Sequence, residues 1–208
     1  ALYARAITNM RGGNLDGART GVQTLISRNS DNPYLWELMG DIEYQFGHYD
    51  DSIAAYEKSL GLAHDAPQIQ TALALVLVER NKPNDNARAI ELSKRALLHE
   101  KMPLTYWVLS RAYGNSDPGR SDWEMAEYYT MINKENDAIK YAKRAQKKLK
   151  NPVLLKKHFL NMQNKFLNII KNVVLTILAK DEAISSTVKT LKSKKKSILI
   201  VSLNSLMR

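Results

Sequence analysis

The sequence contains no cysteine. Disulfide bonds, thiolate metal sites and cysteine nucleophiles are therefore excluded, whereas the redox compartment stays open because a cysteine-free chain folds in either environment. The sequence also lacks any apolar run of about 18 residues, which argues against a membrane-spanning helix. It opens with Ala1 and Leu2 rather than with a methionine and a charged segment before an apolar stretch, so we expect any secretory signal to lie upstream or not to exist.

The chain is also poor in groups that perform catalysis. Of its four histidines, only His99, which is followed by Glu100, begins anything like the HExxH motif of zinc peptidases. The fifth position is Pro103 instead of histidine, so a second imidazole ligand is missing and the helix that the motif requires is interrupted. The serines have no general base at a recognisable spacing, so they indicate no nucleophilic site. Gly12-Gly13 does not match a phosphate-binding loop. We predict no catalytic residue, no metal site and no cofactor on this chain.

Acidic residues are scarce in one region only. Residues 1–150 hold 20 basic and 19 acidic residues, whereas residues 151–208 hold 11 basic and 2 acidic ones. The net charge of +10 therefore belongs almost wholly to the C-terminal segment. The first 150 residues form a nearly neutral body, so its recognition of a partner should depend on surface shape and aromatic side chains.

What the body does contain is a repeat. Pro33, Pro67 and Pro103 each open a similar segment, at spacings of 34 and 36 residues. Apolar and small residues recur within the first segment at steps of three and four, which places them on one face of each of two helices. We predict a turn at Gly47 between these helices. The residues of the pattern are Trp36, Met39, Gly40, Tyr44, Gly47, Tyr49, Ser52, Ile53, Tyr56, Ser59 and Leu60.

These residues resemble the tetratricopeptide repeat, with its aromatic, Leu-Gly-like, tyrosine and small-residue positions. The segment from Pro67 keeps the pattern after a three-residue insertion around residues 82–86, and residues 2–26 read as a repeat truncated at its N-terminus. A helix from Pro103 is followed by an expected interruption over residues 115–121, and then by a further helix pair. The resemblance implies an all-α tetratricopeptide-repeat superhelix of antiparallel helix pairs, about four to five repeats, over residues 1–155.

A superhelix of this kind has a concave side lined by the first helix of each pair. Binding residues should lie on the stripe that packing leaves free, and an aromatic groove with a few charges suits an extended or partly unfolded peptide. The alternative is that Tyr34 and Trp107 pack between repeats. Glu37 and Asp41 would repel a chaperone's terminal carboxylate, which argues against that kind of clamp. The predicted groove residues are Tyr34, Glu37, Asp41, Tyr44, Gln45, Gln68, Thr71, Leu75, Val78, Leu104, Trp107 and Arg111.

A narrower resemblance covers roughly residues 2–155. The order of residues 3–6 (YARA), 31–34 (DNPY), 65–67 (DAP) and 138–145 (AIKYAKRA) is similar to the C-terminal repeat domain of BepA-type zinc metallopeptidases. This resemblance implies a periplasmic Gram-negative protein in outer-membrane protein quality control, with HExxH and zinc on a peptidase domain absent from this chain. The repeats would present substrates or contact partners. The alternative is a standalone tetratricopeptide adaptor without an enzymatic role.

The repeat pattern fades beyond Asn151, and we predict a basic tail over residues 156–208 that is helical or partly disordered. Met162 precedes lysines and a short apolar run, residues 173–179, which resembles the first half of a signal peptide. One hypothesis is a read-through or frameshifted extension; another is an amphipathic helix packed on the last repeat. The lysine cluster at residues 192–196 lacks nearby aromatics and arginines, so we expect no specific nucleic-acid binding, with membrane contact left open as an alternative.

Overall fold

The computed structural model describes residues 1–114 and 116–149. Within these residues every regular element is an α-helix, and none of the helices is both long and apolar enough to cross a membrane. The chain divides into a unit of residues 1–150 and a unit of residues 151–208. All predictions made for the basic tail lie outside the described residues. The helices are α1 (Leu2–Arg11), α2 (Leu15–Ile26), α3 (Pro33–Gln45), α4 (Tyr49–Leu62), α5 (Pro67–Arg80), α6 (Asp85–His99), α7 (Pro103–Tyr113), α8 (Pro118–Met131) and α9 (Glu135–Lys148).

Local sequence signals set the ends of these helices. The three prolines of the repeat stand at the first position of α3, α5 and α7, where the missing N–H costs nothing. Asn32 caps α3 by accepting a hydrogen bond from the backbone N–H of Tyr34. Gly47 turns the chain between α3 and α4 with a φ of 78°, which glycine adopts without strain. The predicted turn is therefore confirmed.

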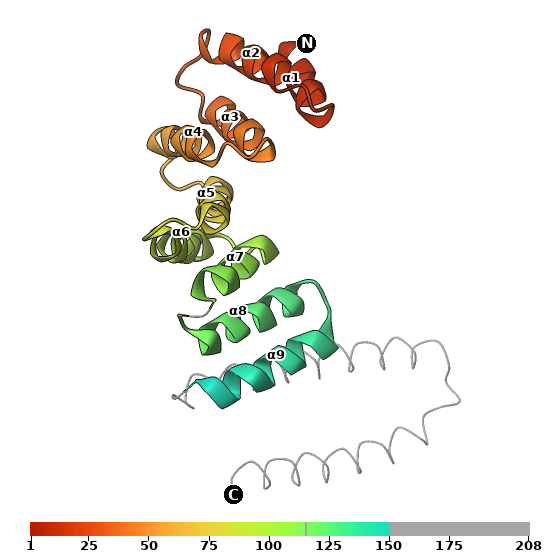
Figure 1. Cartoon of the computed structure of the whole chain (residues 1–208), viewed down its shortest axis with the longest axis vertical. Helices are drawn as coiled ribbons and strands as arrows, with labels where there is room; N and C mark the ends of the chain where they lie inside the picture. Colours follow the sequence, from red (N-terminus) through yellow and green to blue (C-terminus); the bar gives the residue numbers. More distant parts are fainter. Residues whose placement is uncertain (115, 150–208) are drawn as a thin grey trace, which may run out of the picture. The chain divides into compact units, whose positions relative to one another are not determined.

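The helices pack as consecutive antiparallel neighbours. Helix α1 pairs with α2, α3 with α4 and α5 with α6, and each pair contacts the next through α2 and α3, α4 and α5, and α6 and α7. Figure 1 shows α3, α5 and α7 along one side of this stack and α4 and α6 along the other. The predicted all-α stack of helix pairs is confirmed.

The close approach within a pair depends on the small residues of the repeat. The buried Tyr56 of α4 lies against Gly40 of α3, where an added Cβ would come within 2.8 Å of the tyrosine ring. Two serines of α4 seal the contact, because Ser52 donates a hydrogen bond to the carbonyl of Gly40 and Ser59 donates one to that of Pro33, each at 2.8 Å. The spacing of small residues therefore sets how closely α3 and α4 pack.

The predicted break between helices over residues 115–121 is wrong from residue 118 onward, because residues 118–121 are helical. Helix α8 begins at Pro118, capped by Asp117, which accepts a hydrogen bond from the backbone N–H of Arg120. The proline and Gly119 resemble a loop signal, but the proline opens the helix and the glycine makes room for Leu149, whose side chain would lie 2.8 Å from an added Cβ. Helix α8 consequently packs against both α7 and α9.

Ion pairs join adjacent helices at junctions within and between repeats. Arg80 in α5 donates hydrogen bonds from Nη2 and Nε to the buried Asp85 of α6, at 2.6 and 2.9 Å, and from Nη1 to Asp50 of α4 at 2.7 Å. Arg19 of α2 makes a two-point contact with the buried Glu43 of α3, at 2.6 and 2.7 Å. These bidentate contacts give the junctions a defined geometry as well as charge balance.

Candidate binding groove on the first helices

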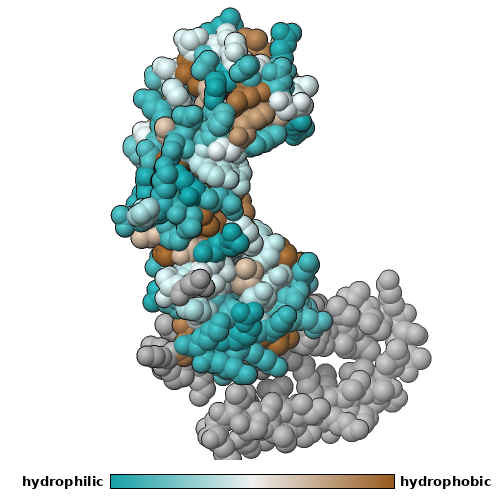
Figure 2. Space-filling view, viewed as in Figure 1, coloured by the Kyte–Doolittle hydropathy of each residue, from teal (hydrophilic) through white to brown (hydrophobic). Residues whose placement is uncertain are grey.

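The first helices expose a row of side chains that begins directly after each repeat proline. Tyr34 is 66% exposed and Leu104 is 45% exposed, and Gln68 holds the equivalent position between them. Figure 2 shows this side of the described unit hollowed near its middle. Large apolar side chains at the same repeat position are thus available to a ligand. The alternative that Tyr34 packs between repeats is wrong, because most of its surface is free.

A pocket of about 410 Å³ lies beside this row at the junction of α3 with α5. Tyr34 and Glu37 form one wall, and the connection from Ala63 to Ala66 with the start of α5 forms the other. Burial, followed by the charge of Asp41, raises the pKa of Glu37. An elevated pKa marks a carboxylate that lacks a compensating cation.

Asp41 lies one helical turn further along the same face. Its carboxylate accepts a hydrogen bond of 2.5 Å from the hydroxyl of Tyr56, which fixes its side chain. Burial raises the pKa of Asp41, and the hydrogen bond from Tyr56 only partly offsets that effect. The two predicted carboxylates of α3 are therefore brought together on one partly buried face.

Tyr44 and Gln45 complete the α3 stripe. The Tyr44 ring lies 6.1 Å from that of Tyr49, and burial, then the nearby Glu79 of α5, raise the pKa of Tyr44. Gln45 donates a hydrogen bond of 2.9 Å to the backbone carbonyl of Met10 in α1, so it links two first helices. Sequence reasoning missed Glu79, although it stands 34 residues after Gln45 and so occupies the same repeat position.

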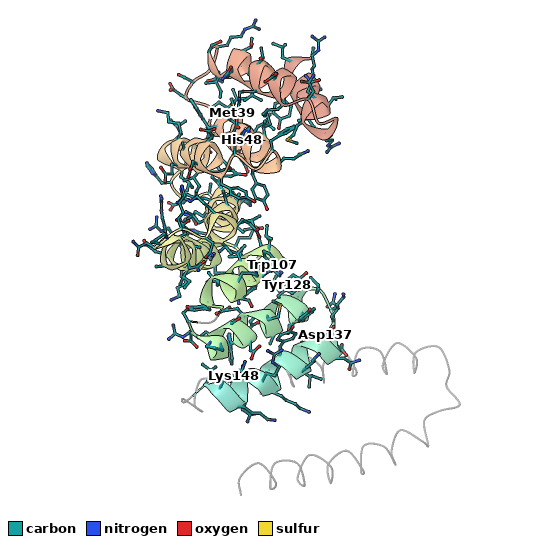
Figure 3. All side chains as sticks on the ribbon, viewed as in Figure 1. Met39, His48, Trp107, Tyr128, Asp137 and Lys148 are labelled. Carbon is teal, nitrogen blue, oxygen red and sulfur yellow. The ribbon has the colours of Figure 1, made fainter. Side chains whose placement is uncertain are left out.

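At the other end, α7 presents Trp107 and Arg111. The guanidinium of Arg111 lies 5.3 Å from the centre of the Trp107 ring, a cation–π contact. Trp107 is partly buried against the main core cluster, so the packing alternative holds for part of its surface. Figure 3 shows Trp107 of α7 and Tyr128 of α8 on the same side of the stack.

A second pocket, of about 500 Å³, continues from Arg111 toward α8 and α9. Its wall includes Asp122, 4% exposed, which binds Arg144 at 3.0 Å and Lys148 at 2.7 Å. Arg144 also lies 4.9 Å from the centre of the Tyr141 ring. Sequence reasoning missed this group because the contact between α8 and α9 depends on where α8 begins. Arg144 and Lys148 of the chain itself therefore compensate the charge of Asp122 at this end of the groove.

A family model for the tetratricopeptide repeat matches residues 3–67 and 37–103. This match agrees with the observed helix pairs and with their 34-residue period. The stack is a tetratricopeptide-repeat superhelix. Arrays of this kind are protein-interaction scaffolds whose first helices line an extended binding surface.

Several solved structures share the fold. A MamA structure superposes with a TM-score of 0.53 at 17% identity, over 71% of this chain and 89% of that chain. PilW, described as a widely conserved type IV pilus biogenesis factor, gives 0.52 at 14% identity, over 91% of this chain and 96% of that chain. An O-GlcNAc transferase mutant from Thermobaculum terrenum gives 0.54 at 18% identity, over 62% of this chain and 25% of that chain. At these identities the likeness concerns the fold alone. No curated protein matches the chain.

Within the tetratricopeptide frame, two predicted groove residues are packing residues. Thr71 is 2% exposed and its hydroxyl lies 2.8 Å from that of the fully buried Thr105 in α7. The two threonines are small enough to let α5 and α7 meet, so Thr71 cannot contact a ligand. Val78 is likewise 8% exposed, whereas Gln68 reaches the surface and donates a hydrogen bond of 2.6 Å to Glu100. Leu75 is partly buried.

The described residues contain one set of side chains with the spacing of metal ligands: Glu43, His48 and Asp51. The guanidinium of Arg19 already binds both oxygens of Glu43 and lies 3.2 Å from Nδ1 of His48. A cation of the protein therefore holds the place that a metal ion would need, and the group fits an ion-paired junction better than a metal site. His99, the only residue that begins a zinc motif, lies 3.9 Å from Asp65.

Proposed function

We propose that this tetratricopeptide module binds an extended or locally unfolded segment of a partner protein along its first helices. The observation that carries the proposal is the row of ligand-accessible side chains at equivalent repeat positions, with Tyr34 and Leu104 exposed by 66% and 45%. An extended segment can meet successive repeats through successive residues. Half-buried Trp107 adds a rigid aromatic contact further along.

A pair of leucines offers a matched test. Leu104 begins the first helix α7, whereas Leu98, 82% exposed, lies near the end of the second helix α6. The probe is a fluorescein-labelled, unstructured peptide of leucine, serine and glycine, followed by fluorescence anisotropy on the full chain. Leu104→Ala should weaken binding by roughly 5- to 10-fold, which corresponds to the loss of about 1 kcal/mol of apolar contact. Leu98→Ala should leave binding unchanged. Equal effects of the two substitutions, or no binding to the wild type, would contradict the proposal.

The narrower proposal is that the module belongs to a BepA-type zinc metallopeptidase of the Gram-negative periplasm. The order of its sequence motifs supports this, and the proposed partner of the repeats is then a peptidase domain encoded elsewhere in the same gene. The alternative is an adaptor that acts without an attached enzyme. Coding DNA with an in-frame HExxH upstream of Ala1 would support the peptidase, whereas a native protein with an intact mass near 23.6 kDa would support the adaptor.

A further inference from the structure

We propose that the α3–α5 part of the groove recognises a basic segment, with lysine or arginine side chains seated against the Glu37–Asp41 pair and against Glu79. This inference rests on the proposed function and names the chemistry of the ligand. It opposes what the net charge of +10 suggests, namely an acidic partner. The groove and the net charge concern different residues, because the excess of basic residues lies in the segment 151–208.

The acids of the groove lack a cation on the chain. Within residues 1–114 and 116–149, neither Glu37, Asp41 nor Glu79 forms an ion pair, and Asp41 has only the neutral hydroxyl of Tyr56 as its side-chain partner. The carboxylates at helix junctions differ, since Glu43 and Asp85 each bind an arginine. Glu79 lines the 500 Å³ pocket together with Arg111 and Arg144 but pairs with neither, so all three groove acids are available to a cation that arrives from outside.

Both carboxylates of the pair on α3 are partly buried, and burial is the largest cause of the raised pKa of Glu37 and of Asp41. A partly desolvated negative charge is costly without compensation. An ammonium or guanidinium group from a ligand would provide that compensation. Partial burial also strengthens the interaction relative to a fully solvated pair.

The two ends of the groove differ in whether the chain supplies cations to their rings and carboxylates. At the α7–α9 end, Arg111 lies over Trp107 and Arg144 lies over Tyr141 while it pairs with Asp122. The chain itself thus supplies cations to the aromatic rings and the carboxylate at that end. At the α3 end, Glu37 and the exposed ring of Tyr34 line the 410 Å³ pocket, and no arginine of the described residues contributes to its wall.

Tyrosine beside carboxylates is a suitable surface for a basic side chain. The aliphatic part of lysine or arginine packs on the ring, and its charged end reaches the carboxylates. Tyr34 and Glu37 share the wall of the 410 Å³ pocket, and Tyr44 lies beside Glu79. Two such places on neighbouring first helices fit two basic residues of one extended segment.

The test compares two peptides that differ only in charge. A fluorescein-labelled peptide of lysine, leucine, serine and glycine is titrated against the full chain, with a second peptide that has glutamine in place of every lysine. We expect the lysine peptide to bind about 3- to 10-fold more tightly, and the difference to shrink as salt is added. A glutamate peptide is unsuitable because the basic residues of the segment 151–208 would attract it.

The variant Glu37→Gln combined with Glu79→Gln should reduce the preference for lysine, because only Asp41 of the three acids is left to support it, while the glutamine peptide binds as before. The control is Asp16→Asn combined with Glu135→Gln, which changes the net charge equally at two exposed acids on α2 and α9; it should keep the preference. Equal binding of both peptides to the wild type would overturn this inference and leave the proposed function standing. Loss of the preference in the control as well would also overturn it, and binding of neither peptide would count against the proposed function itself.

Discussion

Carboxylates at the helix junctions and carboxylates on the first-helix stripe have opposite environments. Glu43 and Asp85 are 3% and 4% exposed, and each is held by two hydrogen bonds from an arginine of an adjacent helix. Glu37 and Glu79 are partly buried and form no ion pair within the described residues. The comparison shows one residue type with two uses, because a carboxylate paired at a junction stabilises the stack and an unpaired one is available to a ligand.

The pKa directions express the same difference. Burial acts to raise the pKa of Glu43, but hydrogen bonds from Arg19 and His48 outweigh it and leave the pKa lowered. The hydrogen bond from Arg80 is the main cause of the lowered pKa of Asp85. In the groove, burial raises the pKa of Glu37 instead. A paired carboxylate therefore favours folding when it is ionised, whereas an unpaired one opposes it.

The largest expected effect comes from breaking a junction. Asp85→Ala leaves Arg80 without its buried partner and should lower the free energy of unfolding by about 3–5 kcal/mol, measured by urea denaturation at neutral pH. Because the folded pKa of Asp85 is lowered, its contribution is present above the unfolded pKa and is lost as the pH falls through the folded one. The difference in the free energy of unfolding between wild type and variant should therefore decrease at acidic pH. A loss below about 1 kcal/mol at neutral pH would contradict a stabilising role.

The next effect concerns Glu124 of α8, an unpaired carboxylate inside the stack. Burial, then the charge of Glu127, raises its pKa to about 7. A raised folded pKa means that stability falls as the pH rises from the unfolded toward the folded value. Glu124→Gln, which imitates the protonated acid, should exceed the wild type by about 2–3 kcal/mol at pH 8 and match it near pH 4, in urea denaturation at both pH values. A difference that does not change with pH would show that Glu124 ionises normally.

A smaller effect tests the packing that holds Asp41 in the groove. Gly40→Ala drives a methyl group into the ring of Tyr56, whose hydroxyl binds Asp41, and should cost about 1–3 kcal/mol in thermal or urea denaturation. Gly61→Ala is the matched control. It lies in α4 with open space around the added Cβ, so it should be neutral or stabilise by up to about 1 kcal/mol. Equal effects at the two sites would mean that the contact with Tyr56 is loose.

The smallest effect is expected where no ion pair is lost. Glu37→Gln combined with Glu79→Gln should change the free energy of unfolding by less than about 1 kcal/mol, and in the stabilising direction, because each change removes a partly buried charge that lacks a partner. Urea denaturation of this variant beside Asp85→Ala compares the two uses of carboxylates directly. A loss as large as that of Asp85→Ala would place the groove acids among the structural ones.

The repeat period predicts much of this arrangement. It places the turn at Gly47 and the small residue Gly40 on the packing face of its helix, because each follows from a local residue and the 34-residue register. It left two possibilities for Tyr34, a groove position or packing between repeats, and the exposed side chain decides for the groove. It fails where neighbouring repeats interlock. Glu37 and Thr71 share one repeat position, yet Thr71 is buried because it is small enough for α7 to approach.

Other features depend on tertiary contacts that the period does not contain. The start of α8 at Pro118 depends on the room that Gly119 leaves for Leu149, and the pairing of Asp122 with Arg144 depends on that start. Register alone would have identified Glu79 from Gln45. It would not have shown that Glu79 lacks an ion pair, because that depends on which carboxylates the arginines of other helices bind.

The most direct test is an NMR titration of the side-chain carboxyl groups of Glu37 and Glu43, with and without a saturating amount of the lysine peptide. In the free chain, Glu37 should have a pKa above the ordinary glutamate value and Glu43 one below it. The bound lysine side chain should lower the pKa of Glu37 and leave that of Glu43 unchanged. A pKa of Glu37 that stays the same in the complex would contradict the assignment of the groove acids to ligand recognition.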